Sequence, residues 1–182
     1  LWELGVRLKL PVIANIPPAE EVLRAWWELL FLPKYWESWP ASFARILVGF
    51  TAAQIVGVPL GLMMAINRHC RDVVFHVVEI LRPVPPVAWI PVAIIFWPTR
   101  EASVVFIAFL GAFWIVIVNV LGGAANIDTR LVRAARSLGA SPGHVFWKII
   151  LPGALPSIFT GMAVGMGITW EVVVAAEMIA GR

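Results

Sequence analysis

The sequence predicts an all-α protein that crosses a membrane several times as a polytopic transmembrane helical bundle. Of the 182 residues, 60% are hydrophobic and only 14% are charged, and the mean hydropathy is +0.87. These values are far from those of soluble domains. Several stretches also reach the roughly 20 apolar residues that a helix needs to cross a hydrocarbon core of about 30 Å.

Residues 1–42 precede the first complete apolar stretch. We interpret residues 1–10 as the end of an earlier span, although their charges also suit a surface helix. The sequence PPAEEVLRAWWELL from Pro17 predicts an external amphipathic helix. Nearby tryptophans suit the membrane–water interface: Trp26, Trp27, Trp36 and Trp39. Because the chain begins at Leu1 rather than Met, we expect an interior piece of a longer protein.

Four stretches are predicted to span the membrane within a single transmembrane domain. They are residues 43–66, 73–97, 102–121 and 154–180. The second stretch is interrupted by Pro83, Pro85, Pro86 and Pro91. Proline removes an N–H donor and clashes with the preceding turn, so we predict two shorter helices there, at 73–81 and 87–97. Glycine pairs four residues apart predict close helix packing: Gly57 with Gly61 and Gly161 with Gly165.

Charges between the spans predict the orientation of the chain. Residues 122–153 carry four basic side chains against one acidic one, which predicts a cytoplasmic location: Arg130, Arg133, Arg136 and Lys148 against Asp128. Counting back places residues 98–101 outside, 67–72 inside and 11–40 outside. The basic pI of about 9.6 therefore reflects topology, and no nucleic-acid partner is expected.

Residues 122–153 are predicted to form a helix, a turn and a second short helix. Asp128 or Thr129 can cap the first helix, and Gly139 suits its left-handed end. Apolar residues recur at helical spacing: Leu131, Ala134, Ala135 and Leu138. We expect the second helix to run to Leu151, where Pro152 stops it. This pattern favours docking in a groove on a partner over an ordinary solvated loop.

Ionisable residues within the spans must face protein or water, because a charge at the bilayer centre costs about 2.5–3.5 kcal/mol. Glu79 and Arg82 are three residues apart, so we expect a mutual ion pair, with substrate contact as the alternative. Glu171 and Glu177 point to different faces. One of them can pair with Arg82, or Glu177 lies near the outer interface. Other candidates to line a pathway, for which packing is the favoured role, are Trp89, Trp114, Asn119 and Trp170.

The sequence carries no motif for catalysis or for a cofactor. It lacks the GxxxxGK[ST] loop that cradles ATP phosphates and the HExxH pattern of a metal site. The single Cys70 excludes a disulfide framework and a cysteine-rich zinc site. We expect a protein that is not an enzyme and holds no cofactor or metal of its own.

Residues 133–152, RAARSLGASPGHVFWKIILP, resemble the EAA loop of permease subunits in binding-protein-dependent ABC importers. Ala134-Ala135 is followed after three residues by Gly139, and after nine more by Ile149-x-Leu151-Pro152. Arg133 stands where that pattern has its first Glu. The stretches LRPVPPVAWIP, LPGALPSIFTGM and VVVAAEMIA resemble the taurine, aliphatic sulfonate, nitrate and bicarbonate branch of these permeases.

The resemblance implies a type I-like permease in a bacterial-type inner membrane, with a second permease copy and an external solute-binding protein. It also implies that this chain is a fragment with outer helices missing at both ends. It also implies cytoplasmic ABC ATPase subunits that carry ATP and Mg. Alternating access would import a small anion, with residues 131–138 seated in a cleft of the ATPase. The implied coupling residues are Leu131, Arg133, Ala134, Ala135, Ser137, Leu138, Gly139, Ala140, Ile149, Leu151 and Pro152. The alternative is a secondary carrier or channel that uses the intramembrane Glu and Arg. It predicts inverted repeats, which are not visible in the sequence.

Overall fold

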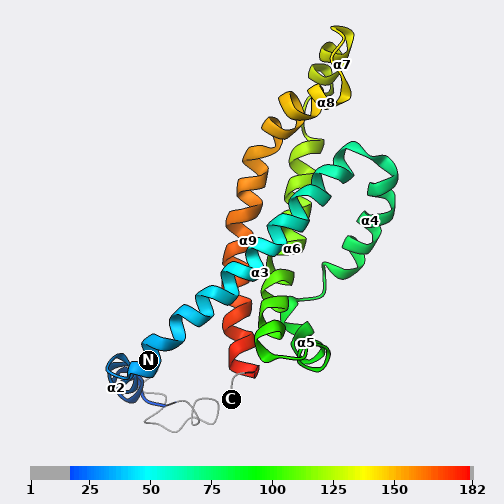
Figure 1. The fold of residues 1–182 in the computed structure, drawn as a ribbon. Coiled ribbons are helices and arrows are strands. Elements are labelled where there is room, and N and C mark those ends of the chain that lie inside the picture. Colours follow the sequence, from blue (N-terminus) through cyan, green and yellow to red (C-terminus); the bar gives the residue numbers. More distant parts are fainter. Residues whose placement is uncertain (1–16, 181–182) are drawn as a thin grey trace. The chain divides into compact units, whose positions relative to one another are not determined.

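The computed structural model describes residues 17–180, and its regular elements in this range are all helical (Figure 1). This confirms the predicted all-α class. Contacts divide the chain into two compact units, with the boundary between Phe43 and Ala44. Residues 1–10, the possible end of an earlier span, lie outside the described residues, and the single-domain organisation stays a prediction.

The first unit contains the predicted amphipathic helix, α2 (Ala19–Leu30). Two acidic residues lie in its first turn, where the helix dipole favours them: Glu20 and Glu21. Helix α3 (Pro33–Ile66) follows after a short turn. The Trp36 indole in the first turn of α3 donates a hydrogen bond to the Leu30 carbonyl of α2 at 2.9 Å. The helix thus begins well before residue 43, where the apolar stretch begins. Hydropathy marks the part that suits lipid, whereas the backbone hydrogen bonds continue into polar sequence.

In the second unit, α3 packs closely against α6 (Arg100–Ala125) along a row of small residues. A Cβ placed on Gly49 would lie 2.5 Å from the Ala108 Cβ, and one on Gly61 would lie 2.8 Å from the Val120 Cβ. Such contacts require glycine, as the predicted spacing implies. Residue numbers rise together along this contact, so α3 and α6 run in the same direction.

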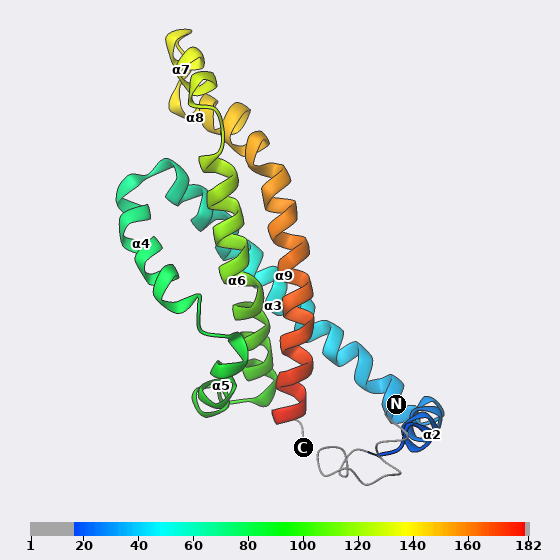
Figure 2. The same ribbon diagram turned by 180° about the vertical axis from the view of Figure 1, so that it is seen from behind.

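Helix α9 (Leu151–Ala180) packs along α6 in the opposite direction (Figure 2). A Cβ on Gly161 would lie 2.8 Å from the Asn119 Cβ, and one on Gly165 would lie 3.3 Å from the Ala112 Cβ. The Thr169 hydroxyl lies 3.3 Å from the Ala108 carbonyl oxygen, to which it donates across the same interface. The predicted glycine pair on α9 therefore sits at a helix contact.

Replacing Gly161 with alanine is expected to destabilise the fold by about 1–3 kcal/mol, because overpacking a tight contact forces the helices apart. Gly167→Ala on the same helix is the matched control, since nothing lies within 4 Å of a Cβ there. Removing a helix-interior glycine at that open position favours the folded state by about 0.5–1 kcal/mol. Thermal unfolding in detergent measures both variants, and equal midpoints would contradict the packing assignment.

Because α3 and α6 are parallel, the chain between them must return to the starting side. It does so through α4 (Arg68–Leu81), η1 (Pro86–Trp89) and α5 (Ile90–Phe96). The two arms are bent by 86° at the predicted proline break. In the described part, α3, α6 and the continuous run Pro142–Ile179 are long and apolar enough to cross a membrane, and the bent pair can serve as a fourth span.

Helix α4 starts earlier than the predicted residue 73. The Asn67 side chain accepts a hydrogen bond from the Cys70 backbone N–H at 3.2 Å, which caps the helix at Arg68. The polar residues 67–72 therefore form its first turns rather than an open loop. The second arm is a short 3-10 turn and a seven-residue helix rather than one helix over residues 87–97.

Candidate functional site

Helix α7 (Thr129–Ser137) has the two end signals that the sequence predicts. The Asp128 carboxylate accepts the Arg130 backbone N–H at 2.8 Å, so Asp128 is the cap. At the other end Gly139 has a φ of 85°, in the left-handed region. The N–H of Ala140 bonds to the Ala135 carbonyl and that of Gly139 to the Arg136 carbonyl, each at 3.0 Å. This pair of bonds is a Schellman motif, which ends the helix sharply.

The second helix of this segment continues directly into the last span. Helix α8 (Pro142–Val145) begins at Ser141, whose hydroxyl accepts the His144 N–H at 3.3 Å. A π-type turn, η2 (Phe146–Ile150), then leads into α9. The prediction that the helix ends at Leu151 and that Pro152 stops it is wrong. The Leu151 N–H donates to the Phe146 carbonyl five residues earlier, which makes a wider turn than an α-helix has. This turn shifts the pattern of backbone hydrogen bonds, so Pro152, which has no N–H, is accommodated in the helix.

A hollow of about 570 Å³ lies between α7 and the start of this second helix. Its lining contains five of the predicted coupling residues together with Ser141, His144 and Lys148: Ala135, Leu138, Gly139, Ala140 and Ile149. Leu138 is 88% exposed and Leu131 is 57% exposed. The apolar stripe of α7 (Leu131, Ala134, Ala135 and Leu138) is therefore largely uncovered within the described part of the chain, as expected of a docking element.

The basic residues of this segment are also exposed. They are Arg130, Arg133, Arg136 and Lys148. Within residues 17–180 none of them forms an ion pair. The only acidic side chain of the segment, Asp128, is engaged in capping α7. The surface of α7 thus combines an uncovered apolar stripe with unpaired positive charge.

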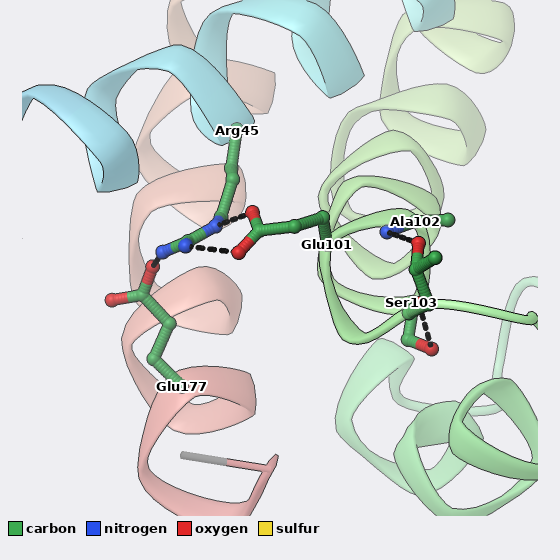
Figure 3. A network of polar contacts seen from close by, with 6 residues as sticks. Arg45, Glu101, Ala102, Ser103 and Glu177 are labelled. Atoms are coloured by element: carbon green, nitrogen blue, oxygen red, sulfur yellow. Dashed lines mark hydrogen bonds and ion pairs between the residues drawn. The ribbon is translucent and has the colours of Figure 1, made fainter.

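A second group of functional interest, which the sequence did not predict, joins three helices of the same unit (Figure 3). Arg45 of α3 donates from Nε and Nη2 to both carboxylate oxygens of Glu101, with an Nη2–Oε1 distance of 2.6 Å. Its Nη1 donates to Glu177 of α9 at 2.6 Å. We call these three residues the Arg45 cluster. A fork-shaped guanidinium can hold two carboxylates in this way, whereas the single point charge of lysine cannot.

Local structure positions Glu101 in the Arg45 cluster. The Thr99 hydroxyl accepts the Ala102 N–H at 3.2 Å and so caps α6 just before Glu101. The buried Ser103 hydroxyl donates to the Ala93 carbonyl at 3.0 Å, which ties the first turn of α6 to α5. Topology is the signal that could have revealed the cluster, because it places all three charged residues at the predicted outer ends of their spans.

The structure separates the other intramembrane candidates. The predicted ion pair between Glu79 and Arg82 is wrong: no ion pair joins them in the described chain, and both are exposed on α4 and just after it. Among residues 17–180 Arg82 forms no ion pair with either glutamate of α9; Glu177 binds Arg45, and Glu171 is exposed. Exposed side chains gain too little from pairing to be held together.

The uncharged candidates differ in their surroundings. The Asn119 side chain donates to the Ile115 carbonyl at 2.9 Å within its own helix, while Trp170 is 38% exposed. The indole N–H groups of Trp89 and Trp114 are buried and have no hydrogen-bond partner within residues 17–180. The side-chain amide of Gln54 on α3 is also buried without a hydrogen-bond partner in this part of the chain. Buried polar groups without partners are uncommon, which makes these three side chains better pathway candidates than Asn119.

A family model and several relatives agree on the family to which this chain is similar. A family model described as a binding-protein-dependent transport system inner membrane component matches residues 57–182. The taurine transport system permease protein TauC of Escherichia coli is 35% identical over 188 residues, which cover 99% of this chain and 67% of that protein. The nitrate import permease protein NrtB of Synechocystis sp. is 36% identical over 141 residues, 78% of this chain and 51% of the relative.

The bicarbonate transport system permease protein CmpB of Synechococcus elongatus is 31% identical over 145 residues, 80% of this chain and 52% of the relative. The chain thus spans about two thirds of the length of the taurine relative and about half that of the other two. These matches confirm the resemblance inferred from residues 133–152. With the family model covering most of the chain, the protein belongs to the family of binding-protein-dependent transport system inner membrane components.

Proposed function

We propose that this chain is the membrane-spanning permease subunit of an ATP-driven importer and that a separate ATPase docks on α7. The uncovered apolar stripe of α7 carries this proposal, since Leu138 and Leu131 are exposed on a segment whose charges predict a cytoplasmic location. The chain has no ATP-binding loop of its own. Nucleotide and Mg would therefore belong to the ATPase, and the permease would hold no cofactor.

We further propose that the cargo is a small anion of the taurine, sulfonate, nitrate or bicarbonate type. The named functions of the relatives support this class. An external solute-binding protein would deliver the anion to a pathway formed by two permease copies in the inner membrane. Alternating access would then follow from closure of the ATPase pair, with α7 passing the movement to the spans.

Reconstitution of the full-length permease with its ATPase and binding protein in proteoliposomes tests this function. We expect uptake of one labelled anion, among taurine, nitrate and bicarbonate, to require both ATP inside the vesicles and the binding protein outside. Uptake that runs without ATP and collapses when an ion gradient is dissipated would instead indicate a secondary carrier. A thermal shift of the binding protein with a sugar or an amine alone would contradict the proposed cargo class.

A further inference from the structure

Three arginines form a charged stripe on α7, which we call the arginine stripe: Arg130, Arg133 and Arg136. They are spaced three residues apart, so they follow one another along one side of the helix. The apolar stripe occupies the other side. All three arginines are exposed, and none has an ion-pair partner in the described chain. The two stripes together define what kind of surface can cover this helix.

An α-helix is only about 10–12 Å across, so a protein cleft that receives α7 by its apolar stripe also comes close to the arginine stripe on the other side. Bringing a neutral or basic surface there would remove water from three positive charges without replacing it, which is unfavourable. A surface with carboxylates offsets that loss and also accelerates the encounter through complementary potentials. Lys148 at the hollow adds a fourth positive charge to the same region.

The position of α7 favours a protein over lipid as the source of the negative charge. Gly123 of α6 lies level with Ser157 of α9. From Ser157 the helical run continues back to Pro142, about 20 Å along the helix axis at 1.5 Å per residue. Both views show α7 and α8 beyond the end of α6 (Figures 1 and 2). If lipid headgroups lie level with the end of α6, a charge about 20 Å beyond them is largely screened from them, because the Debye length is about 8–10 Å.

We propose that the ATPase surface that receives α7 is acidic, with carboxylates opposite the arginine stripe and Arg133 at its centre. This inference rests on the proposed function and specifies the chemistry of the partner. It also assigns a role to the basic residue that stands where the EAA pattern has glutamate. In this chain the charge at that position is positive, so the ATPase must carry the matching negative charge.

The test uses the complete transporter purified through a tag on the permease, with recovery of the ATPase as the readout. We expect Arg133→Glu to weaken ATPase association about fivefold, because one favourable charge contact becomes repulsive. Arg133→Gln should cause a smaller loss. The matched control is Arg68→Glu, an exposed basic residue on the same predicted side of the membrane but outside α7. It should leave recovery unchanged.

Two further measurements separate the possible outcomes. Raising the salt concentration should weaken association of the native pair, and one acidic-to-lysine change on the ATPase should restore recovery with Arg133→Glu. If the native ATPase binds while Arg133→Glu and salt have no effect, the acidic surface is wrong and the proposed function stands. If uptake fails while ATPase binding stays intact, the stripe binds something else, such as lipid, and the inference is overturned. If no ATPase binds the native permease, the proposed function fails as well.

Discussion

Arg45→Leu is expected to destabilise the second unit, because Arg45 joins α3 to Glu101 of α6 and Glu177 of α9. The substitution removes the cation to which both Glu101 and Glu177 are bonded. Losing hydrogen bonds to charged groups costs about 2 kcal/mol, and most of this cost falls at the Glu177 contact, because Glu101 is 63% exposed and water can replace its bonds to Arg45. For a chain of this size that corresponds to a fall of roughly 4–8 °C in the midpoint of thermal unfolding.

Companion variants make this prediction specific to the charge balance. Arg45→Lys keeps the charge but cannot contact both carboxylates in the same way, so an intermediate midpoint is expected. Arg45→Leu combined with Glu101→Gln and Glu177→Gln should recover most of the lost stability, because a neutral cluster has no unpaired charge. If the triple variant is less stable than Arg45→Leu alone, the charges do not explain the effect. Thermal unfolding in lipid nanodiscs measures the whole series.

Gly139→Val is expected to reduce ATP-driven uptake about tenfold while leaving the spans folded. At a φ of 85° glycine is unstrained, whereas a residue with a side chain is disfavoured by about 1–2 kcal/mol, and a β-branched one by more. Nothing lies within 4 Å of a Cβ at this position, so the effect comes from the backbone alone. The Schellman turn would open, and α7 would lose its fixed direction relative to α8.

The control for Gly139→Val is Gly143→Val in α8. A Cβ at Gly143 also meets nothing within 4 Å, and its backbone does not have a positive φ. Gly139→Asn is a second control, because asparagine tolerates the left-handed region better than valine. We expect uptake in the order native, Gly143→Val, Gly139→Asn and Gly139→Val, with similar thermal midpoints for all four. Equal uptake by the two valine variants would show that the turn conformation is not needed for coupling.

The parts of this structure that the sequence predicted correctly depend on local signals. The break between α4 and η1 follows from closely spaced prolines, and the ends of α7 follow from Asp128 and Gly139. The close contacts at Gly61 and Gly161 follow from small-residue spacing. In each case the residues that determine the feature lie within a few positions of it, so no knowledge of the tertiary fold was needed.

The parts that were missed depend on residues far apart or on a balance between neighbours. Arg45 is 56 residues from Glu101 and 132 from Glu177, and nothing in either stretch indicates the pairing without the helix packing. From the sequence, Pro152 predicts a helix end, because proline usually breaks a helix. The π-type turn before Pro152 lets the helix continue into α9, and such a turn has no clear sequence pattern.

Helix α8, the π-type turn and α9 form one continuous helical run, which connects the segment after α7 to the far end of α9. From Leu151 to Glu177 the helix is about 39 Å long, so a rotation of about 5° at the π-type turn moves its far end by about 3 Å. A displacement of that size directed away from Arg45 would break its 2.6 Å hydrogen bond to Glu177. If an ATPase docks on α7 as proposed and tilts α8, the movement would therefore reach the Arg45 cluster at the far end of α9. Breaking the contacts of Arg45 with Glu101 and Glu177 would then add to the free energy that such a tilt requires.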